Sequence, residues 1–428
     1  VFHKTHGMNQ PLFSMRTLYV SRTPADSSVY PTISAALDAI PMDLNEPACI
    51  YLAPGIYHEK ITINKPYLTI LGTGKSNKDV VLTYDDYALL PWLILENSEL
   101  PLYSVFIDTH DVTLQNLTIE NASGDSLTHG QAIALYADGD RLVIDPAADW
   151  TSGYPFTGPL PPKEIEPDGF IGPKQFAPRI NGRQYYKNCY ICGDIDFIFG
   201  SATAYFESCV IESLCRTTNV NGIQGYITAA STPESQEYGY VFSNCKLISK
   251  NCPPNSVYLG RPWRNYAKTV FLECALGNHI HECGFHDWKK EDARNTVLYA
   301  EYRNYPASSA DTPSNNRSLN DDIHCIDGRC IPYPHRAEYV CELDAVQAEH
   351  FSKENVLSGA DHGIHDVLTD GCSSLVPRSS NHRCGELWNS LQIIIVFFSE
   401  NGNISQYFTG VLPAITNADE KELYLSIT

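Results

Sequence analysis

The chain has 428 residues, of which 43% are hydrophobic and 19% are charged, a composition that indicates a folded globular protein and excludes a disordered or coiled-coil one. Asp and Glu number 50 and Lys and Arg number 30, so the formal net charge is −20, which argues against nucleic acid as the main partner. The longest apolar run, residues 391–398, is interrupted and only strand-length, so we exclude a transmembrane protein.

The first segment with a recognisable pattern is a helix expected over residues 30–40, with Pro31 near its start. Its apolar residues fall on one helical face: Ile33, Ala36, Leu37 and Ile40. Such a helix suits the N-terminal cap of a repeat array, whose first coil would otherwise be exposed. Residues 1–10 contain no apolar core of a secretory signal, so we expect a signal to be absent or already removed.

A hexapeptide pattern recurs in the middle of the chain, with apolar residues at its first, fourth and sixth positions. The copies are residues 114–119, 186–191, 206–211, 242–247 and 271–276. Each copy predicts a short β-strand with a bend after its first inward residue. Because the gaps between copies are unequal while the pattern is constant, we predict the stacked coils of a parallel β-solenoid with insertions between coils.

Four of the 14 cysteines occupy the fourth position of this pattern: Cys189, Cys209, Cys245 and Cys274. Stacked coils would place them in one interior column, so we predict packed thiols rather than disulfides. The region from Cys325 to Cys384 is loop-like, and disulfides are plausible there.

Four motifs together resemble the pectin methylesterase (pectinesterase) family. They are Pro-Gly-Ile-Tyr-His-Glu-Lys at 54–60, Gly-Gln-Ala-Ile-Ala-Leu at 130–135, Gly-Asp-Ile-Asp-Phe-Ile-Phe-Gly at 193–200 and Tyr-Leu-Gly-Arg-Pro-Trp at 258–263. The resemblance, to bacterial-type members with a long insertion, runs from about Arg16 to about Tyr305. It implies an all-β, right-handed parallel β-helix with an N-terminal capping helix and an irregular C-terminal region.

The chemistry of the last two motifs can be read from their residue types. Asp196 lies among large apolar residues, where a carboxylate is costly to bury without a partner. The guanidinium of Arg261 is a suitable bidentate partner, and an ionised, oriented carboxylate can attack an ester carbonyl. A buried ion pair without chemistry explains the same residues about equally well.

The resemblance assigns roles to these residues. It implies Asp196 as the nucleophile, Arg261 as its orienting partner and Gln131 as an oxyanion donor. It implies substrate contacts by Trp263, Phe197 and Tyr258, and neither a metal nor an organic cofactor. Purely structural roles are the alternatives. Trp263 could be an aromatic residue of the core or its rim, and Gln131 could form a hydrogen bond between stacked coils.

The chain departs from the family in one place. The family carries a strand followed by Gln-Asp-Thr, which supplies the general acid and a second oxyanion donor, and that tripeptide is absent from this sequence. Residues 144–155 contain two Pro and one Gly instead, which is poor strand sequence. Candidate replacement acids are Asp194, two residues before Asp196, and Asp149 or Asp145 within the altered segment.

Two further groups of residues have side chains that could bind a ligand. His279, His281, Cys283 and His286 look like a metal cluster, but they fall on a late coil of the resemblance and we favour a non-metal interpretation. Residues 160–190 carry a local excess of positive charge that could hold galacturonate carboxylates or form a solvated loop: Lys163, Lys174, Arg179, Arg183 and Lys187.

We therefore expect a pectinesterase that releases methanol from homogalacturonan, impaired if nothing replaces the acid; the alternative is a weak or inactive β-helix protein that binds pectin or another polysaccharide. We expect a β-helix over 16–305, a segment packing on it over 306–358, and an unassigned tail over 359–428 in which 391–398 and 400–409 form a hairpin. The expected partner is pectin, with no nucleic acid and no membrane. We expect a monomer, secreted or cell-wall associated, or alternatively cytoplasmic.

Overall fold

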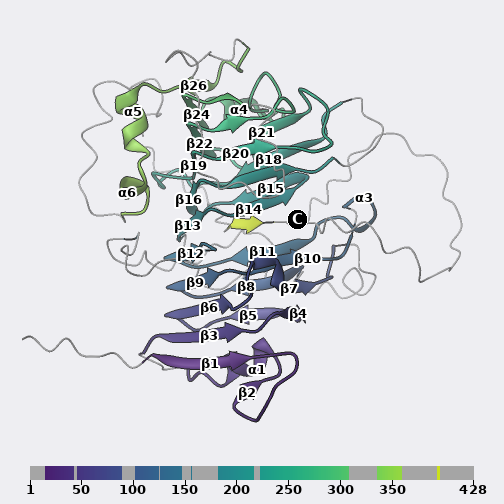
Figure 1. Ribbon diagram of the computed structural model, residues 1–428. Coiled ribbons are helices and arrows are strands. Elements are labelled where there is room, and N and C mark those ends of the chain that lie inside the picture. Colours follow the sequence, from purple (N-terminus) through teal and green to yellow (C-terminus); the bar gives the residue numbers. More distant parts are fainter. Residues whose placement is uncertain are drawn as a thin grey trace, which may run out of the picture. The chain divides into compact units, whose positions relative to one another are not determined.

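The computed structural model describes residues 15–42, 46–88, 102–124, 126–146, 156, 182–215, 222–307, 335–358 and 393–395 (Figure 1). The chain divides into two units, Val1–Phe398 and Ser399–Thr428, and all described residues belong to the first. No helix among the described residues is long and apolar enough to cross a membrane.

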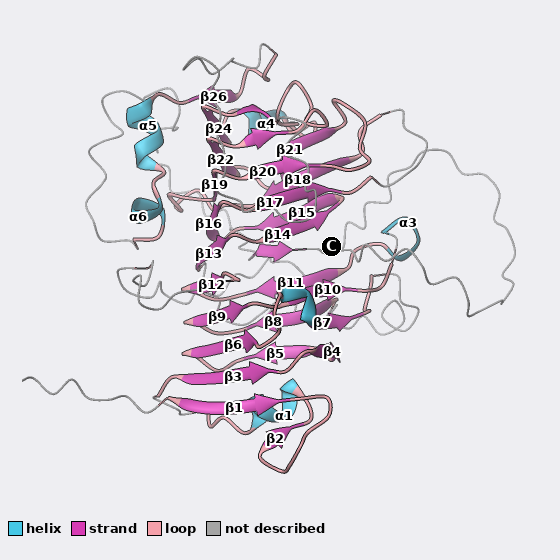
Figure 2. Cartoon of the chain, viewed as in Figure 1, coloured by secondary structure: helices cyan, strands magenta, loops and turns pink. Residues whose placement is uncertain are grey.

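Parallel strands stacked coil on coil form the framework of the described part of this unit, as Figure 2 shows in magenta. The first sheet has twelve strands in the order β2 (Val29–Tyr30), β1 (Arg16–Val20), β3 (Ala48–Leu52), β6 (Leu68–Gly72), β9 (Val112–Gln115), β12 (Leu142–Ile144), β13 (Arg183–Lys187), β16 (Thr203–Glu207), β19 (Tyr240–Ser243), β22 (Lys268–Leu272), β24 (Leu298–Tyr302) and β26 (Val340–Glu342). The second sheet has seven strands in the order β21 (Val257–Pro262), β18 (Gly225–Ala230), β15 (Ile195–Gly200), β27 (Ile393–Ile395), β11 (Ile133–Ala137), β8 (Tyr103–Ile107) and β5 (Ile61–Ile63).

Two smaller sheets form the third face of the coils. One comprises β10 (Thr118–Asn121), β7 (Val80–Tyr84) and β4 (Gly55–His58); the other comprises β14 (Tyr190–Gly193), β17 (Val210–Ser213), β20 (Lys246–Ile248), β23 (Ala275–Leu276) and β25 (Tyr305–Pro306). The helices among the described residues are α1 (Ile33–Asp38), α3 (Ser126–His129), α4 (Glu291–Arg294), α5 (Ala345–His350) and α6 (Lys353–Val356), with a 3₁₀ turn at Asn77–Asp79. The predicted all-β parallel β-helix is confirmed.

The hexapeptide pattern marks the corners of the coils, which corrects the prediction that each copy is one strand. In every copy the third residue has a left-handed backbone conformation: Asn116 (φ 49°), Asn188 (φ 51°), Ser208 (φ 54°), Asn244 (φ 54°) and Glu273 (φ 53°). A single left-handed residue turns the chain from the first sheet to the third face, and Asn tolerates this conformation better than most residues. The bend therefore falls after the second position of the pattern.

The apolar positions of the pattern form columns in the interior. The first-position rings stack face to face, with centroids 4.7 Å apart for Tyr186 and Phe206, 4.4 Å for Phe206 and Phe242, and 4.5 Å for Phe242 and Phe271. The fourth-position cysteines are buried free thiols, each close to backbone carbonyls of its own or the preceding coil, which confirms the predicted packing. The region from 325 to 334 and from 359 to 384, where disulfides were expected, lies outside the described residues.

The N-terminal cap forms as predicted, though it begins at Ile33. The side chain of Thr32 accepts a hydrogen bond from the Ala35 N–H at 3.1 Å, and the Glu59 carboxylate accepts from the first-turn N–H groups of Ile33 and Ser34 at 3.1 Å each. Tyr30 pairs instead with Val20 as part of β2. The buried face of α1 joins the core of the first coil.

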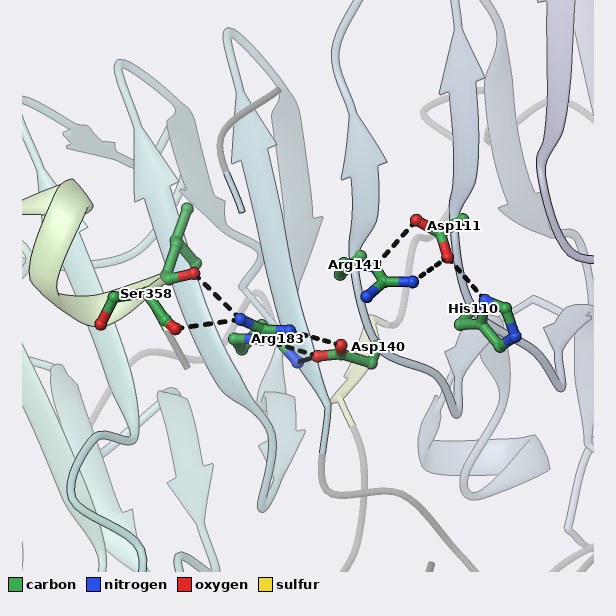
Figure 3. A network of polar contacts seen from close by, with 7 residues as sticks. His110, Asp111, Asp140, Arg141, Arg183 and Ser358 are labelled. Carbon is green, nitrogen blue, oxygen red and sulfur yellow. Dashed lines mark hydrogen bonds and ion pairs between the residues drawn. The ribbon is translucent and has the colours of Figure 1, made fainter. Parts of the chain in front are cut away.

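One coil is incomplete in the described chain. β12 and β13 are neighbours in the first sheet, yet no strand is described between Ile144 and Arg183. Figure 3 shows how the chain is held where it returns: the guanidinium of Arg183 binds the Asp140 carboxylate, with Nη2 to Oδ2 at 2.7 Å and Nε to Oδ1 at 2.9 Å. Both side chains are buried, so this ion pair fixes β13 to the turn before β12.

The second-sheet position of this coil is occupied by β27, which corrects the predicted hairpin. β27 pairs antiparallel with β11 on one side and with β15 on the other. Since both of its edges are taken, it has no edge left for a hairpin partner, and residues 400–409 lie outside the described chain.

We predict that Phe242→Ala lowers the free energy of unfolding by about 3–5 kcal/mol, because Phe242 is fully buried between two stacked rings. Ile56→Ala, at a side chain that is 65% exposed on β4, should change it by less than about 0.5 kcal/mol. Urea unfolding followed by circular dichroism measures both. Equal effects of the two substitutions would contradict the columnar core.

Candidate active site

Asp196 occupies an irregular point of the second sheet. It is the second residue of β15, its φ is 52°, and the register between β15 and β18 shifts between Ile195 and Ile198. A left-handed non-glycine residue at a bulge is strained and re-aims its side chain, a combination that concentrates at functional sites. The Asp196 side chain keeps 19% of its surface exposed, so a small ligand can reach it.

Arg261 grips this carboxylate from β21, two strands away. Its Nε lies 2.9 Å from Oδ1, and its Nη2 lies 2.7 Å from Oδ2. Burial raises the pKa of Asp196 above its ordinary value, and the hydrogen bonds and charge of Arg261 oppose that rise. The predicted pairing of these two residues is present, and it favours an ionised, oriented carboxylate.

Two aromatic rings hold the guanidinium of Arg261 between them. Its central carbon lies 3.9 Å from the centroid of the Tyr226 ring and 3.7 Å from that of the Trp288 ring. Cation–π contacts on both faces restrict Arg261 to the plane in which it meets Asp196. Arg261 is thus fixed by partners on three sides.

Lys290 adds a second positive charge beside the pair. Its ammonium lies over the Trp288 ring at 4.3 Å and donates to the carbonyls of Pro262 and Trp263 at 3.0 and 2.8 Å. Burial lowers the pKa of Lys290 to about 8, and its charge helps to lower the pKa of Asp196. The sequence motifs gave no signal for Tyr226, Trp288 or Lys290, because they meet the site from coils and loops whose spacing is not fixed.

Asp194 is the first candidate acid, and it is buried close to Asp196. Its carboxylate accepts hydrogen bonds from the Ser126 hydroxyl of α3 and from the Ile195 N–H at 2.7 Å. Its negative charge contributes to the raised pKa of Asp196. Asp149 lies outside the described residues, and the buried Asp145 interacts with Tyr185 of the first sheet.

Gln131 is not brought against Asp196. It is an exposed residue just before β11, and β27 lies between β11 and β15 in the sheet. Two strand spacings, about 10 Å, therefore separate the two backbones. Gln131 lies just before the N-terminal end of β11, and no hydrogen bond or ion pair described for this structure joins it to the Asp196–Arg261 pair.

The three predicted substrate contacts differ in exposure. Trp263 is half-buried, with its ring 5.3 Å from that of Phe199. Tyr258 is 9% exposed and stacks on Tyr226 at 5.5 Å. Phe197 is 0% exposed in the core, so its side chain cannot touch a polysaccharide in this conformation. Its place follows from strand alternation, since the neighbour of an outward Asp196 points inward.

The predicted ligand clusters take other roles. Arg183 is buried against Asp140 rather than free for galacturonate, while Lys163, Lys174 and Arg179 lie outside the described residues. His281 stacks on Tyr258 with centroids 4.2 Å apart, and burial lowers the pKa of His279 to about 4. Among the described residues, no group of three or more His, Cys, Asp and Glu is placed to hold a metal.

The coils define a parallel β-helix protein, and its partly exposed carboxylate–guanidinium pair is an arrangement suited to ester hydrolysis. The comparisons with known proteins give the class of enzyme. The Pectinesterase family model matches residues 20–148 and 179–318, leaving out most of the segment between β12 and β13. Pectinesterase 31 of Arabidopsis thaliana is 30% identical over 72% of this chain and 90% of its own, and probable pectinesterase A of Neosartorya fischeri is 34% identical over 68% and 79%.

Solved structures share the fold. The pectin methylesterase from Aspergillus niger has a TM-score of 0.55 at 28% identity, covering 80% of this chain and 93% of that one. The carrot pectin methylesterase has a TM-score of 0.58 at 20% identity, covering 83% and 95%. The chain therefore belongs to the pectinesterase family, the carboxylic ester hydrolases that act on the methyl esters of pectin.

We predict that Arg261→Lys moves the acidic limb of the pH–activity profile to higher pH and lowers kcat/KM by about tenfold to a hundredfold. If Asp196 is the nucleophile, as the resemblance implies, it must be ionised to react, so activity is present above its pKa and lost as pH falls through it. Arg261 lowers that pKa, so weakening the pair raises it. Initial rates across pH test this, with the exposed Arg303→Lys as control; an unmoved acidic limb contradicts the pairing.

Proposed function

We propose that Asp196 is the nucleophile in the hydrolysis of methyl-esterified homogalacturonan and that Arg261 orients it. The observation that carries this proposal is the two-point contact between Arg261 and a strained, partly exposed carboxylate. A carboxylate oxygen held in this way presents its other lone pairs to an ester carbonyl. Family membership supports pectin as the substrate. The half-buried Trp263 offers an aromatic face on which a sugar ring can stack.

The reaction proceeds in two halves. An Asp196 oxygen attacks the ester carbonyl carbon, the bond to the methoxy oxygen breaks, and methanol leaves once that oxygen has taken a proton. The remaining mixed anhydride is attacked by water, which returns Asp196 as a carboxylate and leaves a free galacturonate. The charges of Arg261 and Lys290 beside the site also suit the carboxylates of a partly de-esterified chain.

Protonation of the departing methoxy oxygen is the step for which this site is least well equipped. We propose Asp194 as the acid because its charge acts directly on Asp196. Its carboxylate oxygens already accept hydrogen bonds from the Ser126 hydroxyl and the Ile195 N–H. A lost general acid costs about 10²–10⁴ in rate and a lost oxyanion donor about 10²–10³, so we propose a slow enzyme.

A pectin-binding protein without turnover is the second candidate function. The observation in its favour is that β27, whose three residues are all isoleucine, lies between Gln131 and Asp196 and supplies neither a carboxyl nor an amide side chain. This protein would use the same surface to hold the polysaccharide. We propose that the protein is a monomer and acts outside the cell on the plant cell wall, whichever of the two functions it has.

We predict that the wild-type protein releases methanol from highly methylated pectin and that Asp196→Ala reduces release to the background rate while pectin binding persists. Methanol is measured by coupled oxidation, and binding by affinity electrophoresis in pectin gels. No release by the wild type, with binding retained, would establish the second candidate function.

We predict that Asp194→Asn lowers kcat by about 10²-fold or more if Asp194 delivers the proton. Asp194→Asn keeps the side chain's size, and circular dichroism checks that the fold is kept. The matched control is Asp145→Asn, a buried carboxyl on the first sheet. An unchanged kcat for Asp194→Asn would exclude it as the acid and leave the nucleophile assignment intact.

A further inference from the structure

The second sheet contains one strand that does not come from the coil in which it lies. In complete coils, the three faces follow one another along the chain, as in β9, β10 and β11 or in β13, β14 and β15. β12 has no such successors among the described residues. The place that its coil leaves in the second sheet, between β11 and β15, is taken by β27 from near the C-terminus, drawn in yellow in Figure 1.

The backbone register shows that β27 is paired along both edges. Ile395 stands opposite Leu135 of β11 and Ile198 of β15, and Ile394 stands opposite Tyr136 and Phe199. All other strand pairs described in this sheet are parallel, whereas both pairs formed by β27 are antiparallel. A strand that runs against its neighbours has not followed the winding of the coils and enters from outside their path.

The described segment that ends at Ser358 lies at the level of this gap. The backbone carbonyls of Leu357 and Ser358, at the end of α6, accept hydrogen bonds from Nη1 of Arg183 at 3.3 and 3.0 Å (Figure 3). Arg183 begins β13, the first strand after the incomplete coil. Residues 359–392 then separate Ser358 from β27, and a chain of that length can span up to about 110 Å. The same molecule can therefore supply the strand.

The gap between β11 and β15 needs an occupant because these two strands are buried. All five residues of β11 are buried, as are Phe197 to Gly200 of β15. If β27 were removed, their N–H and C=O groups facing the gap would lose their partners away from water, which proteins rarely tolerate. An extended segment with free backbone groups on both edges meets this requirement, and apolar β-branched residues favour that conformation.

We infer that the gap between β11 and β15 is a strand-binding site and that its occupant is this chain's own segment Ile393–Ile395, which completes the second sheet by strand complementation. The segment joins the coils before the incomplete one to those after it on the face that carries Asp196. This inference does not depend on catalysis, since it concerns backbone pairing alone.

Hydrogen–deuterium exchange of the full chain, read by mass spectrometry, tests the inference. In the wild type, the amides of 135–137 and 198–199 should exchange as slowly as those of β8 and β18. Ile394→Pro removes an N–H and disrupts an inner strand, so exchange at those amides should become at least about tenfold faster. The control, Ile415→Pro, lies beyond β27 and should leave them slow. Fast exchange in the wild type, or no change in Ile394→Pro, would overturn the inference.

A peptide of residues 391–398 added to Ile394→Pro should restore slow exchange at the amides of β11 and β15. This would show that the faster exchange came from loss of the strand and not from general unfolding. The amides of β22 and β24, several coils away, serve as the folding reference. If Ile394→Pro unfolds completely, the wild-type exchange decides alone. Slow exchange that appears only in a dimer on size exclusion would assign the strand to a second copy and contradict the intramolecular occupant.

Discussion

Backbone pairing between successive coils is the constraint on which this structure depends. Every inner strand offers N–H and C=O groups along two edges, and each must find a partner because the strands are buried. Stacking of coils satisfies this and also builds the candidate site, since Asp196, Tyr226 and Arg261 come from the adjacent strands β15, β18 and β21. The site is therefore a column across the sheet, and the incomplete coil lies directly beside it.

In the proposed mechanism, one partly buried carboxylate carries the chemistry. Burial alone would tend to keep the carboxyl of Asp196 protonated and unreactive, and Arg261 counters this with a bidentate contact. The rings of Tyr226 and Trp288 then restrict Arg261 without adding a competing anion. On the other side, where β27 lies, no comparable polar group is provided by the strand itself. In the proposed mechanism the nucleophile is thus oriented by several partners, whereas Asp194 is the proposed proton donor to the leaving group.

The sequence predicted the features that are local and missed those that depend on distant pairing. The pairing of Asp196 with Arg261 was accessible because each lies in a dense motif, and the cysteine column was visible as a repeat. Phe197 was misassigned because motif membership was given more weight than strand alternation, which turns it inward. The place of β27 could not be predicted, since an antiparallel register between segments so far apart leaves no periodic signal. The role of Trp288 could not be predicted either, because its contact with Arg261 depends on the path of a loop.

The most direct test of the account is to capture the bond that it assigns to Asp196. Turnover of a methylated oligogalacturonate should be quenched within one catalytic cycle in the presence of hydroxylamine, and the protease-digested protein analysed by mass spectrometry. The account predicts a hydroxamate on the peptide that contains Asp196 or on the galacturonate, according to which carbonyl of the anhydride hydroxylamine attacks, and neither product in Asp196→Ala. Methanol release by the wild type with neither hydroxamate would contradict the account, because a water molecule rather than the carboxylate would then attack the ester.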